Sequence, residues 1–136
     1  MITAVDTNVM LDLFGADPVF GSRSQRSVRS CLSEGRLIAC EVVWAEVASF
    51  FPSTDDAEVA LNRLGVEYSP ITLKTALAAS KVWKLYRSRG GKRERVVADF
   101  LIGAHAALQA ERLLTRDRGF YRTYFSRLRL LDPSTA

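Results

Sequence analysis

The sequence predicts one α/β domain with a mainly parallel central sheet of four to five short strands flanked by helices. Short apolar runs of strand length alternate with longer segments of helical periodicity, an order that is typical of parallel βαβ units. The chain has 136 residues, of which 48% are hydrophobic and 25% charged. This size and composition suit a single domain, residues 1–136, with its own core.

In the first half of the chain, local signals set the expected boundaries. Gly15 and Gly65 end helices, and Pro52 stops one because proline lacks an amide hydrogen and restricts the residue before it. Ser53, Thr54, Asp55 and Asp56 are suitable cap residues for the helix that follows, which runs to about Leu64. The expected elements are a strand at 2–6, helices at 8–14 and 22–34, a strand at 37–40, a helix at 42–51, and a helix that begins at the cap candidates 53–56 and ends at about 64.

In the second half, Gly90 and Gly91 indicate a loop between two helices. The second of these helices carries Asp99. The expected elements are a strand at 66–68, a helix at 73–88, the Asp99 helix, a strand at 112–115, a turn and short helix within 117–125, and a strand at 128–131.

Composition excludes several classes of protein. No run reaches the roughly 18 to 20 apolar residues of a membrane span, and the first residues lack the pattern of a signal peptide. We therefore expect a soluble cytoplasmic protein. Cys31 and Cys40, without a CxxC pair or a histidine at metal spacing, are expected to be reduced core thiols.

Asp99 is the most informative residue. It is the only charged residue in the apolar run V-V-A-D-F-L-I-G-A-H-A-A-L. A lone carboxylate on a largely buried helix must be paired, hydrogen-bonded, protonated or bound to a metal, because removing a charge from water is costly. Asp99 is therefore the first candidate for function.

Three further acids are expected near Asp99. Asp6 and Asp117 lie at or just after the carboxyl ends of predicted strands, where ligands bind in parallel sheets, and Glu46 lies early in the helix after the second strand. Four converging carboxylates repel one another unless a cation neutralises them. Ligands that are all oxygen favour Mg²⁺ or Mn²⁺ over zinc.

Such ions allow hydrolysis without a protein nucleophile, because a bound metal lowers the pKa of water and stabilises charge on an attacked phosphodiester. A ribonuclease mechanism based on histidine would need two imidazoles, whereas the chain has only His105, which is expected to be structural. A haloacid-dehalogenase-like phosphatase would need an Asp at Asn8. A receiver domain would need a late lysine, but the last one is Lys92.

Basic residues make a polyanionic substrate plausible. The formal net charge is +4, and two dense basic stretches could hold phosphates around an acidic pocket, although many basic helical faces are only solvated. The candidate RNA-binding residues are Lys81, Lys84, Arg87, Arg93, Arg95, Arg116 and Arg118.

Four motifs, V-D-T-N, W-A-E-V, A-D-F-L-I-G-A-H-A and L-L-T-R-D-R-G-F, occur in that order along the chain. Together they resemble the acidic motifs of PIN-domain ribonucleases, and within these the VapC-type toxins of type II toxin–antitoxin systems. The resemblance covers essentially the whole chain. It implies a PIN-like three-layer fold, a metal-dependent endoribonuclease acting on cellular RNA, a homodimer, and inhibition by a small VapB-like antitoxin.

Carried over to this sequence, the resemblance implies that Asp6, Glu46, Asp99 and Asp117 hold Mg²⁺ or Mn²⁺ and position the attacking water. Asn8 and Thr115 would support them through hydrogen bonds.

Some relatives have a further acid soon after the Asp117 position, where this chain has Arg118 and Gly119, so the number of metal ions stays open. Asp12 is a weaker candidate for compensation and is expected to be a surface acid. The alternative function is a catalytically silent PIN-like module that binds RNA or protein.

Overall fold

The computed structural model describes residues 1–91 and 96–135. Five strands form one sheet in the order β3-β2-β1-β4-β5, and all four pairings are parallel. This confirms the predicted α/β class. The strands are β1 (Ile2–Val5), β2 (Arg36–Ala39), β3 (Val66–Tyr68), β4 (Arg112–Leu114) and β5 (Leu130–Leu131).

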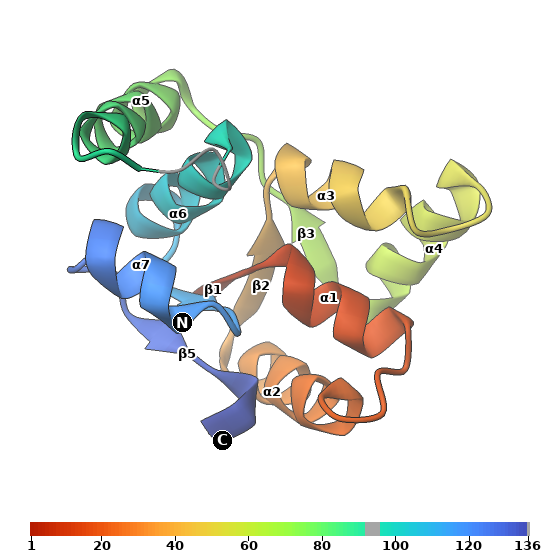
Figure 1. Ribbon diagram of the computed structural model, residues 1–136. Coiled ribbons are helices and arrows are strands. Elements are labelled where there is room, and N and C mark those ends of the chain that lie inside the picture. Colours follow the sequence, from red (N-terminus) through yellow and green to blue (C-terminus); the bar gives the residue numbers. More distant parts are fainter. Residues whose placement is uncertain (92–95, 136) are drawn as a thin grey trace.

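Helices cover both faces of the sheet and complete three layers (Figure 1). On one face α6 contacts β1 and β4, and α5 packs outside α6. On the other face α2 packs with α1 and contacts β2. The helices are α1 (Thr7–Phe14), α2 (Gly21–Glu34), α3 (Glu41–Ala48), α4 (Thr54–Leu64), α5 (Leu73–Ser88), α6 (Val97–Gln109) and α7 (Arg118–Tyr124), followed by a 3-10 turn at Pro133–Thr135.

Local signals explain most of these boundaries. The Ser53 hydroxyl accepts the amide hydrogen of Asp56 at 3.1 Å and caps α4, which satisfies one of the free N–H groups of the first turn. Gly65 ends α4 with φ of 96°, a left-handed conformation that favours glycine. Two elements are shorter than predicted by more than one residue: α3 ends at Ala48 rather than at 51, and β5 has two residues rather than four.

The strand order places a switch point at β1. The chain runs outward from β1 to β2 and β3, then returns through α5 and α6 to β4 on the other side of β1. In a parallel sheet the crevice at such a switch, beyond the carboxyl ends of the strands, is where ligands bind. Asp6 directly follows β1 at this edge.

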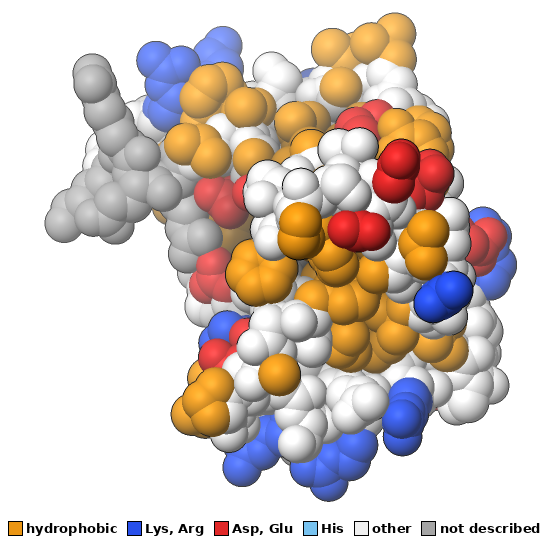
Figure 2. Space-filling model, turned by 90° about the vertical axis from the view of Figure 1, so that its right-hand side faces the viewer, with side chains coloured by type: hydrophobic (Ala, Val, Ile, Leu, Met, Phe, Trp, Pro, Cys, Tyr) orange, Lys and Arg blue, Asp and Glu red, His pale blue; other side chains and the backbone are white. Residues whose placement is uncertain are grey.

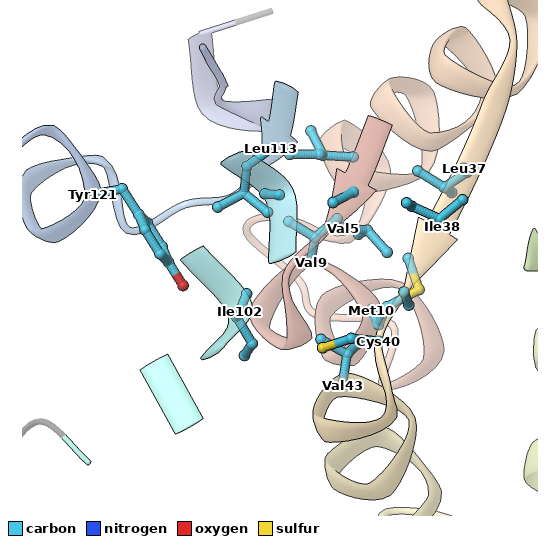
Figure 3. Close-up of a cluster of buried hydrophobic side chains, with 14 of the residues drawn as sticks. Val5, Val9, Met10, Leu37, Ile38, Cys40, Val43, Ile102, Leu113 and Tyr121 are labelled. Carbon is cyan, nitrogen blue, oxygen red and sulfur yellow. The ribbon is translucent and has the colours of Figure 1, made fainter. Parts of the chain in front are cut away.

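Below that edge lies a core of buried apolar side chains. Val5, Leu37 and Leu113 of three adjacent strands are each at most 1% exposed. Figure 3 shows them together with side chains of α1, α3 and α6, and with Tyr121 at the margin of the cluster. A tightly packed core of this kind is a rigid support for the polar residues that follow the strands.

A Cβ atom at Gly103 would clash with the Phe125 ring, so this glycine permits close packing on α6. Two smaller sequence predictions, for the cysteines and for the histidine, are confirmed. Cys31 and Cys40 are free and buried. His105 is 1% exposed and its Nε2 lies 3.0 Å from the Ser69 hydroxyl, as suits a structural histidine. Within the described ranges, no helix is long and apolar enough to cross a membrane.

Candidate active site

Asp6 lies at the centre of the carboxyl edge and is only 6% exposed. Its Oδ1 accepts the amide hydrogen of Thr7 at 2.8 Å and so caps α1. Its Oδ2 accepts hydrogen bonds from the Thr115 hydroxyl at 2.8 Å and from the Tyr121 hydroxyl at 3.2 Å. The carboxylate is therefore held by donors to both of its oxygens.

Burial raises the pKa of Asp6 from 3.8 to about 6, and the nearby charge of Asp117 adds to the rise. The hydrogen bonds from Thr115, Thr7 and Tyr121 act in the opposite direction, because each stabilises the charged form. A carboxylate that is this costly to ionise gains strongly from a neighbouring cation.

Asn8 and Thr115 connect Asp6 to the segment after β4. The Asn8 Nδ2 lies 3.4 Å from Asp6 Oδ2 and 3.5 Å from the Thr115 hydroxyl, and its Oδ1 accepts the amide hydrogen of Arg116 at 3.2 Å. The amide of Asp117 donates to the Thr115 hydroxyl at 3.0 Å. These contacts tie residues 115–117 to the start of α1.

Asp99 and Asp117 are related to Asp6 through Tyr121, because their charges act on the phenol that donates to Asp6. Asp99 is half-buried in the first turn of α6, where its Oδ2 accepts the amide hydrogen of Val96 at 3.3 Å. Burial and the charges of Asp6, Asp99 and Asp117 all raise the pKa of the Tyr121 phenol. The phenol therefore stays neutral as a hydrogen-bond donor, with three carboxylates around it.

Glu46 joins the site from the exposed side of α3. The Thr7 hydroxyl donates to Glu46 Oε1 at 2.7 Å. Because Thr7 is the residue next to Asp6, this hydrogen bond brings Glu46 to the neighbourhood of the central carboxylate. The four acids that the sequence predicts as a group thus lie toward one edge of the sheet. The charges of three of them act on Tyr121, and the fourth, Glu46, accepts a hydrogen bond from Thr7.

Tyr121 and Thr7 are site residues that the sequence analysis missed. Thr7 lies inside the V-D-T-N motif, and its position beside Asp6 was an available signal. Tyr121 is one of several aromatic residues in a short helix, and nothing in the local sequence distinguishes it from a core residue.

The prediction that Asp12 is a surface acid is wrong. Asp12 is 5% exposed, and it forms a two-point ion pair with Arg116. The helix α1 lies against α2, so this side of α1 is covered.

The chemistry of the four acids suits a divalent ion. Asp6, Glu46, Asp99 and Asp117 offer only carboxylate oxygens, the ligands that Mg²⁺ and Mn²⁺ prefer. Among residues 1–91 and 96–135, however, no three acidic, histidine or cysteine side chains are close enough together to hold an ion. The ligand types of these residues fit such an ion, but their spacing does not, so the carboxylates would have to move closer together to bind it.

The residues predicted to bind RNA fall into three groups. Lys81, Lys84 and Arg87 are exposed on α5. Arg118 forms an ion pair with buried Asp132 at 2.7 Å, and Arg116 pairs with Asp12. Arg93 and Arg95 lie outside the described residues.

Comparison with known families found a match to the PIN domain over residues 3–126. This range begins within β1, ends just after α7, and includes all four acids. A comparison with curated protein sequences found no match.

Solved structures with a similar fold span nearly the whole chain. A chain of VapBC2 from Rickettsia felis, bound to a DNA fragment from its promoter, is 19% identical with a TM-score of 0.75, over 97% of this chain and 98% of that one. VapBC-1 from nontypeable Haemophilus influenzae is 20% identical with a TM-score of 0.75, over 98% and 99%. FitAcB from Neisseria gonorrhoeae is 20% identical with a TM-score of 0.67, over 100% of both. At these identities the likeness shows a common fold.

Proposed function

This chain belongs to the PIN domain family, and on that premise we propose that it is a metal-dependent endoribonuclease that hydrolyses phosphodiester bonds in cellular RNA. The observation that carries the proposal is that the charges of Asp6, Asp99 and Asp117 all act on the Tyr121 phenol, while Glu46 accepts a hydrogen bond from Thr7, the residue next to Asp6. Carboxylates that face one region repel one another, and a divalent cation is the ordinary way to bring them together and stabilise them.

The four acids would hold Mg²⁺ or Mn²⁺. When bound, such an ion supplies an activated water and neutralises charge on the attacked phosphate. Thr115, Tyr121 and the amide of Thr7 hold the Asp6 carboxylate in a fixed orientation. Thr7 does the same for Glu46. Fixed ligands reduce the reorganisation needed when a substrate binds.

RNA as the substrate is supported by the distribution of charge. The formal net charge is +4 although the carboxyl edge of the sheet is acidic. Lys81, Lys84 and Arg87 are all exposed on α5, which packs on the Asp99 helix. A basic surface beside an acidic centre allows phosphates to be bound while the acids hold cations.

The test is RNA cleavage by purified protein freed of any partner. Cleavage is expected with Mg²⁺ or Mn²⁺ and is expected to stop in excess chelator. Asp6→Asn and Asp99→Asn should abolish it, whereas Asp55→Asn, which changes an exposed acid at the start of α4, should not. Cleavage that persists in chelator contradicts the mechanism. Metal-independent RNA binding without cleavage would favour the alternative of a silent binding module.

We further propose that the protein acts in the cytoplasm as the toxin of a toxin–antitoxin pair and is inhibited by a small VapB-like antitoxin. The similar solved structures include a toxin–antitoxin complex from Klebsiella pneumoniae. Figure 2 shows apolar side chains gathered on the face that carries α1, α3 and α4. On this face, the rings of Phe14 and Phe51 pack edge to face with their centres 5.2 Å apart, and Phe50 is 55% exposed.

A partner that covers this face should bind through apolar side chains. If a small neighbouring gene encodes the antitoxin, its product should co-purify with the wild-type chain and more weakly with Phe50→Glu. Undiminished co-purification with Phe50→Glu would place the antitoxin elsewhere.

We also expect a homodimer. Leu73 and Leu77 of α5 and Leu108 of α6 are exposed apolar residues that line one groove, and light scattering of the isolated protein tests this expectation.

A further inference from the structure

We propose that the ion pair between Asp12 and Arg116 is a positioning device that holds residues 115–117 in place at the active site. The inference rests on the proposed function, because it assigns a role toward Asp6 and Asp117. Neither Asp12 nor Arg116 needs to touch RNA or metal for this role. They would act through the segment that joins β4 to α7.

The geometry of the pair is that of a fork. Arg116 Nε donates to Asp12 Oδ2 at 2.6 Å and Nη2 donates to Oδ1 at 2.9 Å. Ser24 of α2 donates a further hydrogen bond to Asp12 Oδ2 at 3.2 Å. The guanidinium carbon lies 4.1 Å from the centre of the Phe20 ring. Both the charge and the plane of Arg116 are therefore fixed from α1 and from the start of α2.

Arg116 lies between two residues of the site. On one side Thr115 donates to Asp6, and on the other Asp117 adds its charge to the same region. The backbone amide of Arg116 donates to Asn8 Oδ1, and that of Asp117 donates to the Thr115 hydroxyl. Side chain and backbone thus fasten this segment to α1 at two separate points, Asp12 and Asn8.

The two residues are 104 positions apart in sequence, so their contact closes a long stretch of chain. Asp12 is 5% exposed and the Arg116 side chain 29%, which limits screening by water. A two-point pair in such a place restricts orientation more than a single surface contact does. It therefore sets where Asp117 stands relative to Asp6.

A direct RNA contact by Arg116 predicts different behaviour. Asp12→Asn would then release the guanidinium and leave cleavage intact or improved. Arg116→Lys would keep a positive charge for a phosphate. If the fork positions the segment, Asp12→Asn and Arg116→Lys should behave alike, because lysine lacks the planar fork.

The experiment compares Asp12→Asn and Arg116→Lys with wild type and with Glu34→Gln. Glu34 forms an ion pair at 3.0 Å with Arg112, the first residue of β4, whereas Arg116 follows the other end of β4. The Glu34 variant is therefore a matched control. Amide hydrogen exchange is measured at Arg116 and Asp117, with Leu113 of β4 as the reference. RNA cleavage with Mn²⁺ is measured in parallel, separating kcat from KM.

In both test variants, exchange at Arg116 and Asp117 should rise by about tenfold or more while that at Leu113 stays unchanged. In both, kcat should fall by about tenfold with little change in KM, as expected when only the reacting geometry is lost. Glu34→Gln should show neither effect. If Asp12→Asn does not fold, Arg116→Lys provides the same comparison.

Unchanged exchange at Arg116 and Asp117 in a folded variant would overturn the inference. So would a loss expressed only in KM, which would mark Arg116 as an RNA-binding residue. If wild-type protein does not cleave RNA at all, the proposed function fails, and the exchange measurement still decides whether the pair holds the segment.

Discussion

Tyr121 donates its hydroxyl hydrogen to Asp6 across 3.2 Å, and the charges of Asp99 and Asp117 act on the same phenol. One neutral side chain from α7 thus stands among carboxylates that come from the end of β1, from α6 and from the segment after β4. The negative charges keep the phenol neutral, and its hydrogen bond stabilises the charge of Asp6.

Removing this hydroxyl should affect catalysis most at acidic pH. The hydrogen bond from Tyr121 lowers the pKa of Asp6, so Tyr121→Phe raises that pKa and extends protonation of Asp6 to higher pH. Cleavage should fall roughly fivefold near the acidic limb, the effect of one hydrogen bond of about 1 kcal/mol, and recover at higher pH. A pH–rate profile checks this, and a uniform loss at all pH values would contradict it.

The stability of the metal-free protein should depend on Asp6. Its pKa is raised from 3.8 to about 6, so the folded state holds the proton more tightly than the unfolded state. This contribution to stability is fully present below pH 3.8 and is lost as the pH rises through about 6.

Asp6→Asn should therefore stabilise the metal-free protein at neutral pH, by up to about 3 kcal/mol for a shift of this size. Urea unfolding in chelator, at pH values on either side of 6, measures the difference. Equal free energies of unfolding for wild type and variant at neutral pH would show that Asp6 is not destabilising there.

Thr7 should control the position of Glu46. Thr7→Val keeps the shape of the side chain but removes the donor that meets Glu46 Oε1 at 2.7 Å. We expect kcat to fall by roughly tenfold, in line with about 1.5 kcal/mol for one hydrogen bond to a charged group, and Thr7→Ser to restore most of it. A Thr7→Ser variant as impaired as Thr7→Val would mean that packing of the methyl group matters instead.

The basic face of α5 should contribute to RNA binding through phosphates. Replacing Lys81, Lys84 and Arg87 with Glu should weaken RNA binding. It should also flatten the plot of the logarithm of the binding constant against that of the salt concentration, by about 0.7 in slope for each phosphate that is no longer neutralised. Reversal of Arg63, an exposed residue of α4, serves as the control. If the slope does not change, the arginines between 112 and 129 become the candidates.

The sequence predicts the parts of the site that depend on regular structure. Asp6 follows a short apolar strand and Asp99 interrupts an apolar helix, so periodicity and the cost of burying a charge were enough to find them. Glu46 and Asp117 followed from the rule that ligands gather beyond the carboxyl ends of parallel strands.

Other features of the site depend on how distant segments meet, which periodicity does not encode. Asp12 was expected at the surface because the pattern of α1 does not show that α2 and Arg116 cover it. The directions of the Tyr121 and Thr7 hydroxyl groups are fixed by packing between elements. The start of β5 also differs from expectation, because sheet pairing rather than local composition determines which residues of an apolar run join the sheet.

Calorimetric titration of the metal-free protein with Mn²⁺ decides whether the acids at the carboxyl edge form a site for a divalent ion. Wild type should bind Mn²⁺. Asp6→Asn and Asp99→Asn should each bind at least about tenfold more weakly, since each removes one charged ligand, while Asp55→Asn should match wild type. Absence of Mn²⁺ binding to wild type, or equal affinity in all four proteins, would mean that these acids do not form a site for the ion.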